Sequence, residues 1–465
     1  MRIENVEVSC YMRIFSRHKL ACSVYLLIPL FISSCHKSED TSVADSEQVE
    51  TGDSGIIESK SYNVVLILTD TFRADHIGAY GYARDTTPWF DTFANDAVLF
   101  ESATSQNAWT PASVSSLFTG LYTRSHGVVS YMPEGTMEGS VLEEVHVTLA
   151  ELFDNAGYTT GALVKSPVPQ VVSGFSQGFD SFEKVEGREA YEESGGDLAD
   201  AAIAWLSENS SGDEPTFLYL HFMEPHAPYI APAPYHDQFD DGWDSELQGT
   251  HAEVMAFRTG IAEPTEDDIG HLISLYDGEI AYWDSQVQRI VEHVDQLGLS
   301  DDTIVAFVGD HGEQFNEHGD WLHGALYQEN IHVPLVVRVP GVTGRRVVEP
   351  VQMMDLGPTL AEFCGLGTVD YWQARSLASS MVGGGVPSDA VFYEYGTERG
   401  VRTAGGMKML FEDGVYRLFD LNNDPGELVD LGGVPAYESV LAELQEIERT
   451  IFAESDEISQ DLFGE

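Results

Sequence analysis

The chain has 465 residues and a formal net charge of −54, from 23 basic and 77 acidic side chains. An acidic excess of this size argues against general binding to nucleic acid or to anionic membrane surfaces, because both are negatively charged themselves. It is typical of a protein that is solvated at high ionic strength. The length is enough for one large α/β domain and a smaller one.

The N-terminal segment has the pattern of an export signal. Basic residues precede an apolar run over residues 20–32, and the sequence Ile32-Ser-Ser-Cys35 resembles a bacterial lipobox. A short apolar run with these flanks is typical of a secretory signal and not of a membrane span. We therefore expect a signal peptide over residues 1–34, export to the bacterial cell envelope, and attachment to a membrane through a lipid on Cys35.

An acidic linker is expected over residues 35–60, between this anchor and the folded part of the chain. Two of the four cysteines, Cys10 and Cys22, fall within the predicted signal peptide. The mature chain then keeps Cys364 besides the anchor, so we expect no structural disulfide within it.

The first predicted strand is a run of apolar, strand-forming residues over 64–68, VVLIL, and it leads to Asp70. Such a run is typical of a strand buried on both faces, as in a parallel sheet covered by helices. In open α/β sheets, ligands bind at the carboxyl ends of these strands. Asp70 is therefore a candidate functional residue, although an aspartate here could instead only cap the following turn.

A helix is predicted between Thr110 and Gly120. Thr110 followed by Pro111 is typical of an N-cap and a first helical residue, and glycine is a typical C-terminal stop. The Thr110 hydroxyl would then lie at the positive end of the helix dipole, where an anion is stabilised. Thr110 is either only a cap or a nucleophile that a metal ion and the helix terminus activate.

The middle of the chain alternates predicted helices and strands. His221 lies within one of these strands and is expected to be structural. The predicted elements are a helix over residues 147–156, strands over 158–165 and 216–222, and a helical segment over 268–297 with core residues at helical spacing.

A second buried strand over residues 303–308, TIVAFV, leads to Gly309-Asp310-His311-Gly312-Glu313. Two central strands that deliver Asp70, Asp310 and His311 to one edge of a sheet predict a divalent-metal site, because carboxylates and imidazole are ligands for such ions. The alternative is that the adjacent aspartate and histidine form only a hydrogen-bonded pair.

The last part of the chain has the pattern of a smaller subdomain. After a strand over residues 334–339 comes a glycine-rich stretch that ends near residue 387. Beyond it we expect short antiparallel strands and a final amphipathic helix. The predicted strands span residues 390–395, 408–412 and 415–420, and the helix spans 437–452.

These motifs together resemble the sulfatase family of the alkaline phosphatase superfamily. The resemblance runs from DTFRADHIGAYGY through HFMEPHAPY and GDHGE to YRLFDLNNDPGE, and it covers nearly everything after residue 60. It implies an α/β catalytic domain over residues 61–385, with a central, mostly parallel sheet between helices. It also implies a small C-terminal subdomain, an antiparallel sheet plus a helix, over residues 386–465.

The resemblance also implies roles for three further residues. Lys165 occupies the position of a lysine that holds the anionic oxygens of the substrate, but Ser166 and Pro167 replace the tryptophan and histidine that follow it. Lys165 could therefore also be a simple edge-strand lysine. His226 matches a histidine that faces the bound ester, for substrate contact or proton transfer. His323 stands where sulfatases carry a lysine and several phosphoester-cleaving relatives carry a histidine.

The sequence departs from the family at the nucleophile. Sulfatases carry a cysteine or serine at the position of Thr110, and an enzyme oxidises it to formylglycine. Oxidation of the secondary alcohol of a threonine would give a ketone instead. The surrounding signature is changed as well, since Ala112 replaces its proline and Val114 its arginine, and Thr71 replaces the second acid of an Asp-Asp pair.

We therefore expect a metal-dependent ester hydrolase or group transferase that acts on phosphomonoesters, phosphodiesters or phosphonates through Thr110. Threonine nucleophiles occur in phosphoester-cleaving relatives, such as lipoteichoic acid synthases, where one acid, one threonine and an Asp-His pair hold a single metal ion. By this resemblance, the ligands are Asp70, Thr110, Asp310 and His311, and Mn²⁺, Zn²⁺, Mg²⁺ and Ca²⁺ all remain open. Two alternatives are a sulfuric ester hydrolase without formylglycine and a catalytically inactive binding protein.

Overall fold

The computed structural model describes most of the chain from residue 60 onward, and these residues belong to one compact unit. The predicted signal peptide, the linker up to residue 59 with Cys35, and the Ser166-Pro167 pair lie outside the described residues. Among the described helices, none is long and apolar enough to cross a membrane. The described residues are 60–129, 140–165, 172–185, 194–210, 212, 214–388 and 390–464.

A mostly parallel central sheet has eight strands in the described residues, in the order β13-β2-β12-β9-β1-β8-β5-β7. Strand β12 runs antiparallel to both of its neighbours, and the other pairs are parallel. The strands are β1 (Asn63–Thr69), β2 (Val98–Phe100), β5 (Thr159–Val164), β7 (Ser181–Lys184), β8 (Thr216–Phe222), β9 (Thr303–Gly309), β12 (Leu335–Arg338) and β13 (Arg345–Val347).

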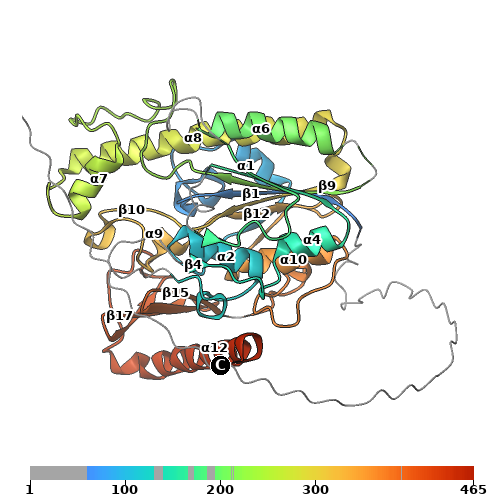
Figure 1. The fold of residues 1–465 in the computed structure, drawn as a ribbon. Coiled ribbons are helices and arrows are strands. Elements are labelled where there is room, and N and C mark those ends of the chain that lie inside the picture. Colours follow the sequence, from blue (N-terminus) through green and yellow to red (C-terminus); the bar gives the residue numbers. More distant parts are fainter. Residues whose placement is uncertain are drawn as a thin grey trace, which may run out of the picture. The chain divides into compact units, whose positions relative to one another are not determined.

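Helices cover both faces of this sheet (Figure 1). Alternate residues of β1 enter two separate apolar cores, because successive side chains of a strand point to opposite faces. Val64 and Leu66 pack in the core that also contains residues of α2 (Thr110–Thr119), α4 (Leu149–Asn155) and α10 (Leu356–Phe363). Val65 and Ile67 pack in the other core, with residues of α1 (Pro88–Asn95), α6 (Ser194–Asn209) and α8 (Glu266–Gln296).

A separate antiparallel sheet follows in the C-terminal part, with α12 (Glu438–Phe463) packed against it through buried Leu444. Within the described residues it has four strands, of which the sequence predicted three. The unpredicted one, β16, has the polar sequence ERGVRT, which lacks the apolar alternation of a typical strand. The strands are β15 (Ala390–Tyr395), β16 (Glu398–Thr403), β17 (Met407–Glu412) and β18 (Val415–Asp420).

These two parts confirm the predicted fold class, a parallel α/β sheet between helices with a small antiparallel sheet and helix after it. The remaining elements are short. The helices are α3 (Thr123–His126), α7 (His251–Arg258), α9 (Gln328–Ile331) and α11 (Ala378–Met381), and the strands are β3 (Ala103–Thr104), β4 (Ser140–Val141), β6 (Val172–Ser173), β10 (Gln314–Phe315), β11 (Trp321–Leu322) and β14 (Val351–Gln352).

Candidate active site

The carboxyl ends of β1 and β9 place two acids beside each other. Thr69 at the end of β1 lies opposite Gly309 at the end of β9, and Asp70 and Asp310 follow them. The backbone pairing extends past the strands, because the Asp310 N–H donates to the Thr69 carbonyl at 3.2 Å. Both acids are buried, with exposed fractions of 2% and 0%. The strand ends therefore fix two buried carboxylates at one edge of the sheet.

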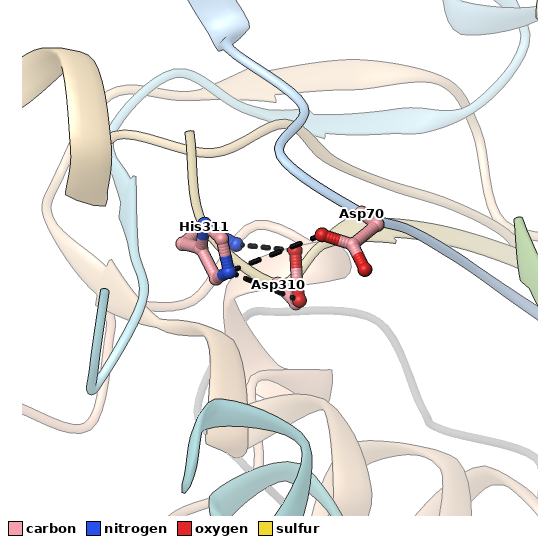
Figure 2. Close-up of side chains that lie close together, drawn as sticks. All are labelled: Asp70, Asp310 and His311. Atoms are coloured by element: carbon pink, nitrogen blue, oxygen red, sulfur yellow. Dashed lines mark hydrogen bonds and ion pairs between the residues drawn. The ribbon is translucent and has the colours of Figure 1, made fainter. Parts of the chain in front are cut away.

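His311 completes a compact cluster with these acids. Its Nε2 lies 3.5 Å from Asp310 Oδ2 and 3.9 Å from Asp70 Oδ1 (Figure 2). Its Nδ1 lies 3.0 Å from the Gly312 carbonyl oxygen. Because a carbonyl can only accept, Nδ1 must carry a proton, and Nε2 is the ring nitrogen that faces the two acids and could bind a metal ion.

This cluster fits a divalent cation. Asp70, Asp310 and His311 each offer one ligand atom, and these atoms lie within 4.8 Å of one another. Asp310 Oδ2 is buried and has no hydrogen-bond partner among the described residues. Two buried carboxylates so close together repel each other unless a positive charge lies between them. The metal that the family commonly uses would therefore be held by these side chains.

The pKa values of the two acids diverge. Burial and the neighbouring charge of Asp70 raise the pKa of Asp310. Burial favours the neutral form of Asp70 as well, but the neighbouring imidazoles of His221, His226 and His311 outweigh it and hold the pKa of Asp70 below its usual range. Asp70 is therefore the acid that stays ionised most readily.

Thr110 lies beside this cluster. Helix α2 begins at Thr110 itself, and Trp109 with extended backbone is the N-cap, so the predicted N-cap position was one residue too late. The Thr110 hydroxyl is therefore not needed for capping. Its Oγ1 lies 3.1 Å from His311 Nε2 and 3.4 and 3.5 Å from the two carboxylate oxygens of Asp70. The first turn of a buried helix thus presents a hydroxyl to the candidate metal ligands.

Two further predicted residues, His226 and His323, lie next to each other at the site. The His323 ring is 4.6 Å from the His311 ring and 5.4 Å from the His226 ring, between ring centres. His226 Nδ1 donates to the Ala227 carbonyl oxygen at 2.6 Å, and His323 Nδ1 lies 3.1 Å from Glu313 Oε1. Each ring therefore uses Nδ1 for support and keeps Nε2 for another partner.

Burial and neighbouring charges shift the pKa values of His323, His226 and Glu313 in different directions. Burial lowers the pKa of His323, and His311 and His226 lower it further. Burial also disfavours the charged form of His226, but Asp70 and Glu313 raise its pKa above the ordinary value. Burial raises the pKa of Glu313 to about 7.

The structure places Lys165 in an ion pair with a neighbouring helix. It follows β5, and its ammonium lies 3.6 Å from the Asp197 carboxylate of α6. Only 5% of the Lys165 side chain is exposed. Among the described residues, this lysine is thus an ion-pair partner of α6, and its contact with a substrate stays a prediction.

Sequence reasoning missed two residues of the site. His221, which was expected to be structural, has its Nε2 3.7 Å from Asp70 Oδ2. Glu313 is fully buried and accepts a hydrogen bond from the Tyr229 hydroxyl at 3.2 Å, while its other oxygen faces His323. Both lay within reach of sequence reasoning, since His221 is near the end of a strand and Glu313 follows the Asp-His pair by two residues.

The fold and the cluster together define an ester-hydrolysing enzyme of α/β architecture. Residues 62–366 match the family model described as Sulfatase, and residues 316–452 match the model described as N-sulphoglucosamine sulphohydrolase, C-terminal. The chain belongs to the sulfatase family.

Known proteins similar to this chain include sulfatases, a multifunctional alkaline phosphatase superfamily protein and a phosphonate monoester hydrolase. An arylsulfatase of Clostridium perfringens is 26% identical over 458 residues, which cover 83% of this chain and 93% of that protein. A multifunctional alkaline phosphatase superfamily protein of Trinickia caryophylli is 25% identical and covers 82% of this chain and 93% of its own length. The phosphonate monoester hydrolase of Agrobacterium radiobacter has the same fold, with a TM-score of 0.72, 23% identity, and 85% of this chain and 96% of that one covered.

Proposed function

We propose that this sulfatase-family hydrolase acts on phosphoesters, as a hydrolase or a phosphoryl-group transferase, with Thr110 as its nucleophile. The observation that carries the proposal is the position of the Thr110 hydroxyl, 3.1 Å from His311 and 3.4 Å from Asp70. A threonine in this place cannot become the aldehyde on which formylglycine chemistry depends, so its own oxygen is the available nucleophile. The similarity to a phosphonate monoester hydrolase and to a multifunctional alkaline phosphatase superfamily protein supports the same substrate class.

The reaction has two displacements at phosphorus. In the first, Thr110 Oγ1 forms a bond to phosphorus, the bond to the leaving oxygen breaks, and the departing alcohol takes up one proton for the one that Thr110 loses. In the second, the oxygen of a water molecule attacks phosphorus and Thr110 leaves with its proton restored. An alcohol in place of water would give group transfer instead of hydrolysis.

The other side chains of the site support these displacements. A divalent cation held by Asp70, Asp310 and His311 would lower the pKa of the attacking hydroxyl and offset charge on the phosphoryl group. His226 and His323 each use Nδ1 for a contact within the site, so Nε2 could hold a phosphoryl oxygen or pass a proton to the leaving group. The buried position of Thr110 limits competing attack by bulk water.

Substitution of Thr110 tests the proposal directly. Thr110→Val keeps the branched shape and removes the hydroxyl, so we expect turnover to fall by about 1,000-fold or more while the fold remains. Thr110→Ser should keep measurable activity. The assay is a panel of phosphomonoesters, phosphodiesters, phosphonates and sulfate esters with each of the four metals, and mass spectrometry of trapped wild-type protein should find phosphate on Thr110.

A matched control is Thr119→Val in the same helix, because the Thr119 hydroxyl is also buried but, among the described residues, bonds only to the Ser115 carbonyl oxygen. This variant should keep its turnover. Near-normal turnover of Thr110→Val would show that water and not Thr110 attacks the ester. Turnover of sulfate esters alone would instead establish the sulfuric ester hydrolase, and metal binding without any turnover would establish the binding protein.

We also infer that the mature chain is exported and held at the cell envelope by a lipid on Cys35. The lipobox-like sequence Ile32-Ser-Ser-Cys35 after a short apolar run supports this location. The acidic stretch over residues 36–59 would then separate the anchor from the catalytic domain.

A further inference from the structure

The loop that carries His323 depends on its surroundings for its shape. It runs from Glu313 to Gly324, and its non-glycine residues Asn316, His318 and Leu322 have φ angles of 73°, 53° and 65°. Side chains with a Cβ rarely adopt this left-handed region, and they persist there only where the surrounding structure compensates for the strain. The pairing of β10 with β11 holds part of the loop from within, and contacts from outside the loop add to this support at His323.

Arg258 supplies such contacts. It is the last residue of α7, and its Nη2 donates to the His323 carbonyl oxygen at 3.1 Å. Its Nε lies 3.8 Å from the Asp320 carboxylate, within the same loop. One planar guanidinium thus reaches two points of the loop at once, which the single ammonium of a lysine would not reproduce.

Helix α7 is itself held firmly against the rest of the protein. Its first turn has a capping box between Thr250 and Glu253. Val254 is fully buried, and the Phe257 ring packs 5.1 Å from the ring of Trp321 in the loop. The helix is therefore a fixed support from which Arg258 can hold the loop.

Tyr395 of the C-terminal sheet also lies close to the end of the loop. Gly324, directly after His323, has a φ of +119°, and a Cβ placed there would lie 3.0 Å from the Tyr395 hydroxyl and 3.5 Å from Arg258 Nη2. The glycine therefore leaves room for Tyr395 of β15 and Arg258 of α7 to lie close to the same turn.

We propose that Arg258 is a positioning residue, which holds the His323 loop so that the imidazole stays between Glu313 and the His226 ring and faces the substrate. The proposal rests on the substrate contact that the proposed function assigns to His323. Arg258 itself need not touch the substrate, although 32% of its side chain is exposed. It comes from the same segment between β8 and α8 that carries His226, but the sequence pattern did not single it out.

A double-mutant cycle between Arg258 and His323 tests this proposal. The readouts are kcat/KM with the best ester of the panel and the affinity for inorganic phosphate, measured by titration calorimetry on the metal-loaded protein. Arg258→Gln should lower both by about 10-fold, because small displacements of a substrate-contacting group have effects of this size. In the His323→Ala background, Arg258→Gln should cause no further loss.

Two comparisons separate positioning from a general loss of structure. Arg258→Lys should be impaired in the same readouts, and Arg258→Gln should keep its metal content and its melting temperature. Arg289→Gln is the matched control, because Arg289 also forms an ion pair, with Asp200, but on the outer helices. It should match the wild type in all readouts.

Several results would overturn the proposal. Losses that multiply in the double variant would show that Arg258 acts on the substrate directly. An Arg258→Gln protein with wild-type kcat/KM and phosphate affinity would show that the loop needs no such support. The wild-type protein could bind phosphate without turning over any ester, and Arg258→Gln could lower that affinity. This result would overturn the proposed function and keep this inference. A wild-type protein that neither binds phosphate nor turns over an ester would overturn both.

Discussion

Among the candidate metal ligands, we expect substitution of Asp310 to weaken metal binding most. It is fully buried, and its Oδ2 lacks a hydrogen-bond partner among the described residues. Asp310→Asn keeps the size and removes the charge, so we expect metal affinity to fall by about 100-fold or more, since even the loss of an outer partner costs about 10- to 100-fold. Metal content by mass spectrometry and a chelator competition measure the effect, and most activity should be lost with the metal.

The control is Asp355→Asn. Asp355 is also a buried acid, and burial raises its pKa to about 7, but it accepts hydrogen bonds from the backbone of Gln352 and Arg375 away from the site. Its substitution should leave the metal content unchanged. Unchanged metal content and rate in Asp310→Asn would remove Asp310 from the ligand set.

Single residues of the site could be predicted where backbone geometry alone places them. Asp70 and Asp310 follow buried parallel strands, whose carboxyl ends share one edge of the sheet, so the sequence indicated that they would meet. The partner of Lys165 could not be predicted in this way. Asp197 lies on a helix, and which helical residue faces a strand end depends on how the helix packs, which the local sequence does not determine.

At the scale of elements, the C-terminal sheet is fastened to the catalytic part by a buried ion pair. The Lys408 ammonium of β17 lies 2.6 Å from Glu427 Oε1 and donates to the Leu326 carbonyl oxygen at 2.7 Å. The other carboxylate oxygen of Glu427 accepts a hydrogen bond from the Gln328 backbone. Neither charged side chain is exposed. Each end of the pair is therefore bonded to the segment that follows the His323 loop.

Removal of one partner should cost far more than removal of both. Lys408→Met leaves Glu427 buried without its counter-charge, so the free energy of unfolding should fall by about 3–5 kcal/mol. Lys408→Met combined with Glu427→Leu should recover most of this loss. Arg449→Gln, which breaks an exposed pair with Glu446, should stay within about 1 kcal/mol of wild type.

Urea unfolding of the four proteins measures these differences. A Lys408→Met protein as stable as the wild type would mean that water reaches Glu427 and that the pair does not fasten the sheet. A double variant no better than the single one would point to the backbone contacts of Leu326 and Gln328, and not to the uncompensated charge, as the source of the loss.

Elements were predicted best where they are buried on both sides. The central strands have continuous apolar runs, and β1, β8 and β9 were recognised within one or two residues of their ends. Strand β16 was missed because partly exposed residues dominate its sequence. Helix α12 extends to Phe463, beyond the predicted end at residue 452. The prediction ended too early because the later turns are mostly polar and bury little besides Ser455 and Ile458.

At the scale of the whole molecule, the proposed location of the protein rests on Cys35. The wild-type protein should partition with membranes and carry lipid, because the multiple acyl chains of a lipoprotein hold far better than a single chain. Cys35→Ala should lose the lipid, and the released protein should keep its turnover. Membrane fractionation together with mass spectrometry of the N-terminal peptide checks both points.

Cys364→Ala is the matched control, since Cys364 is buried in the folded part and should have no influence on lipid attachment. Wild-type protein that is recovered without lipid and with its leader intact would contradict the anchor. The catalytic predictions would remain unaffected by that result, because the described part of the chain contains the whole candidate site.

The pairing of β1 with β9 has a consequence for how the protein responds to its surroundings. Thr71, next to Asp70, donates its backbone N–H to Asp310 at 3.1 Å across 239 residues of chain. Unfolded chains hold these segments far apart, so a cation that needs both acids binds only the assembled sheet. Binding then adds to stability by mass action, by about 2.7 kcal/mol when the free ion is at 100 times its dissociation constant. The supply of metal around the protein would thus influence how much of it stays folded as well as its activity.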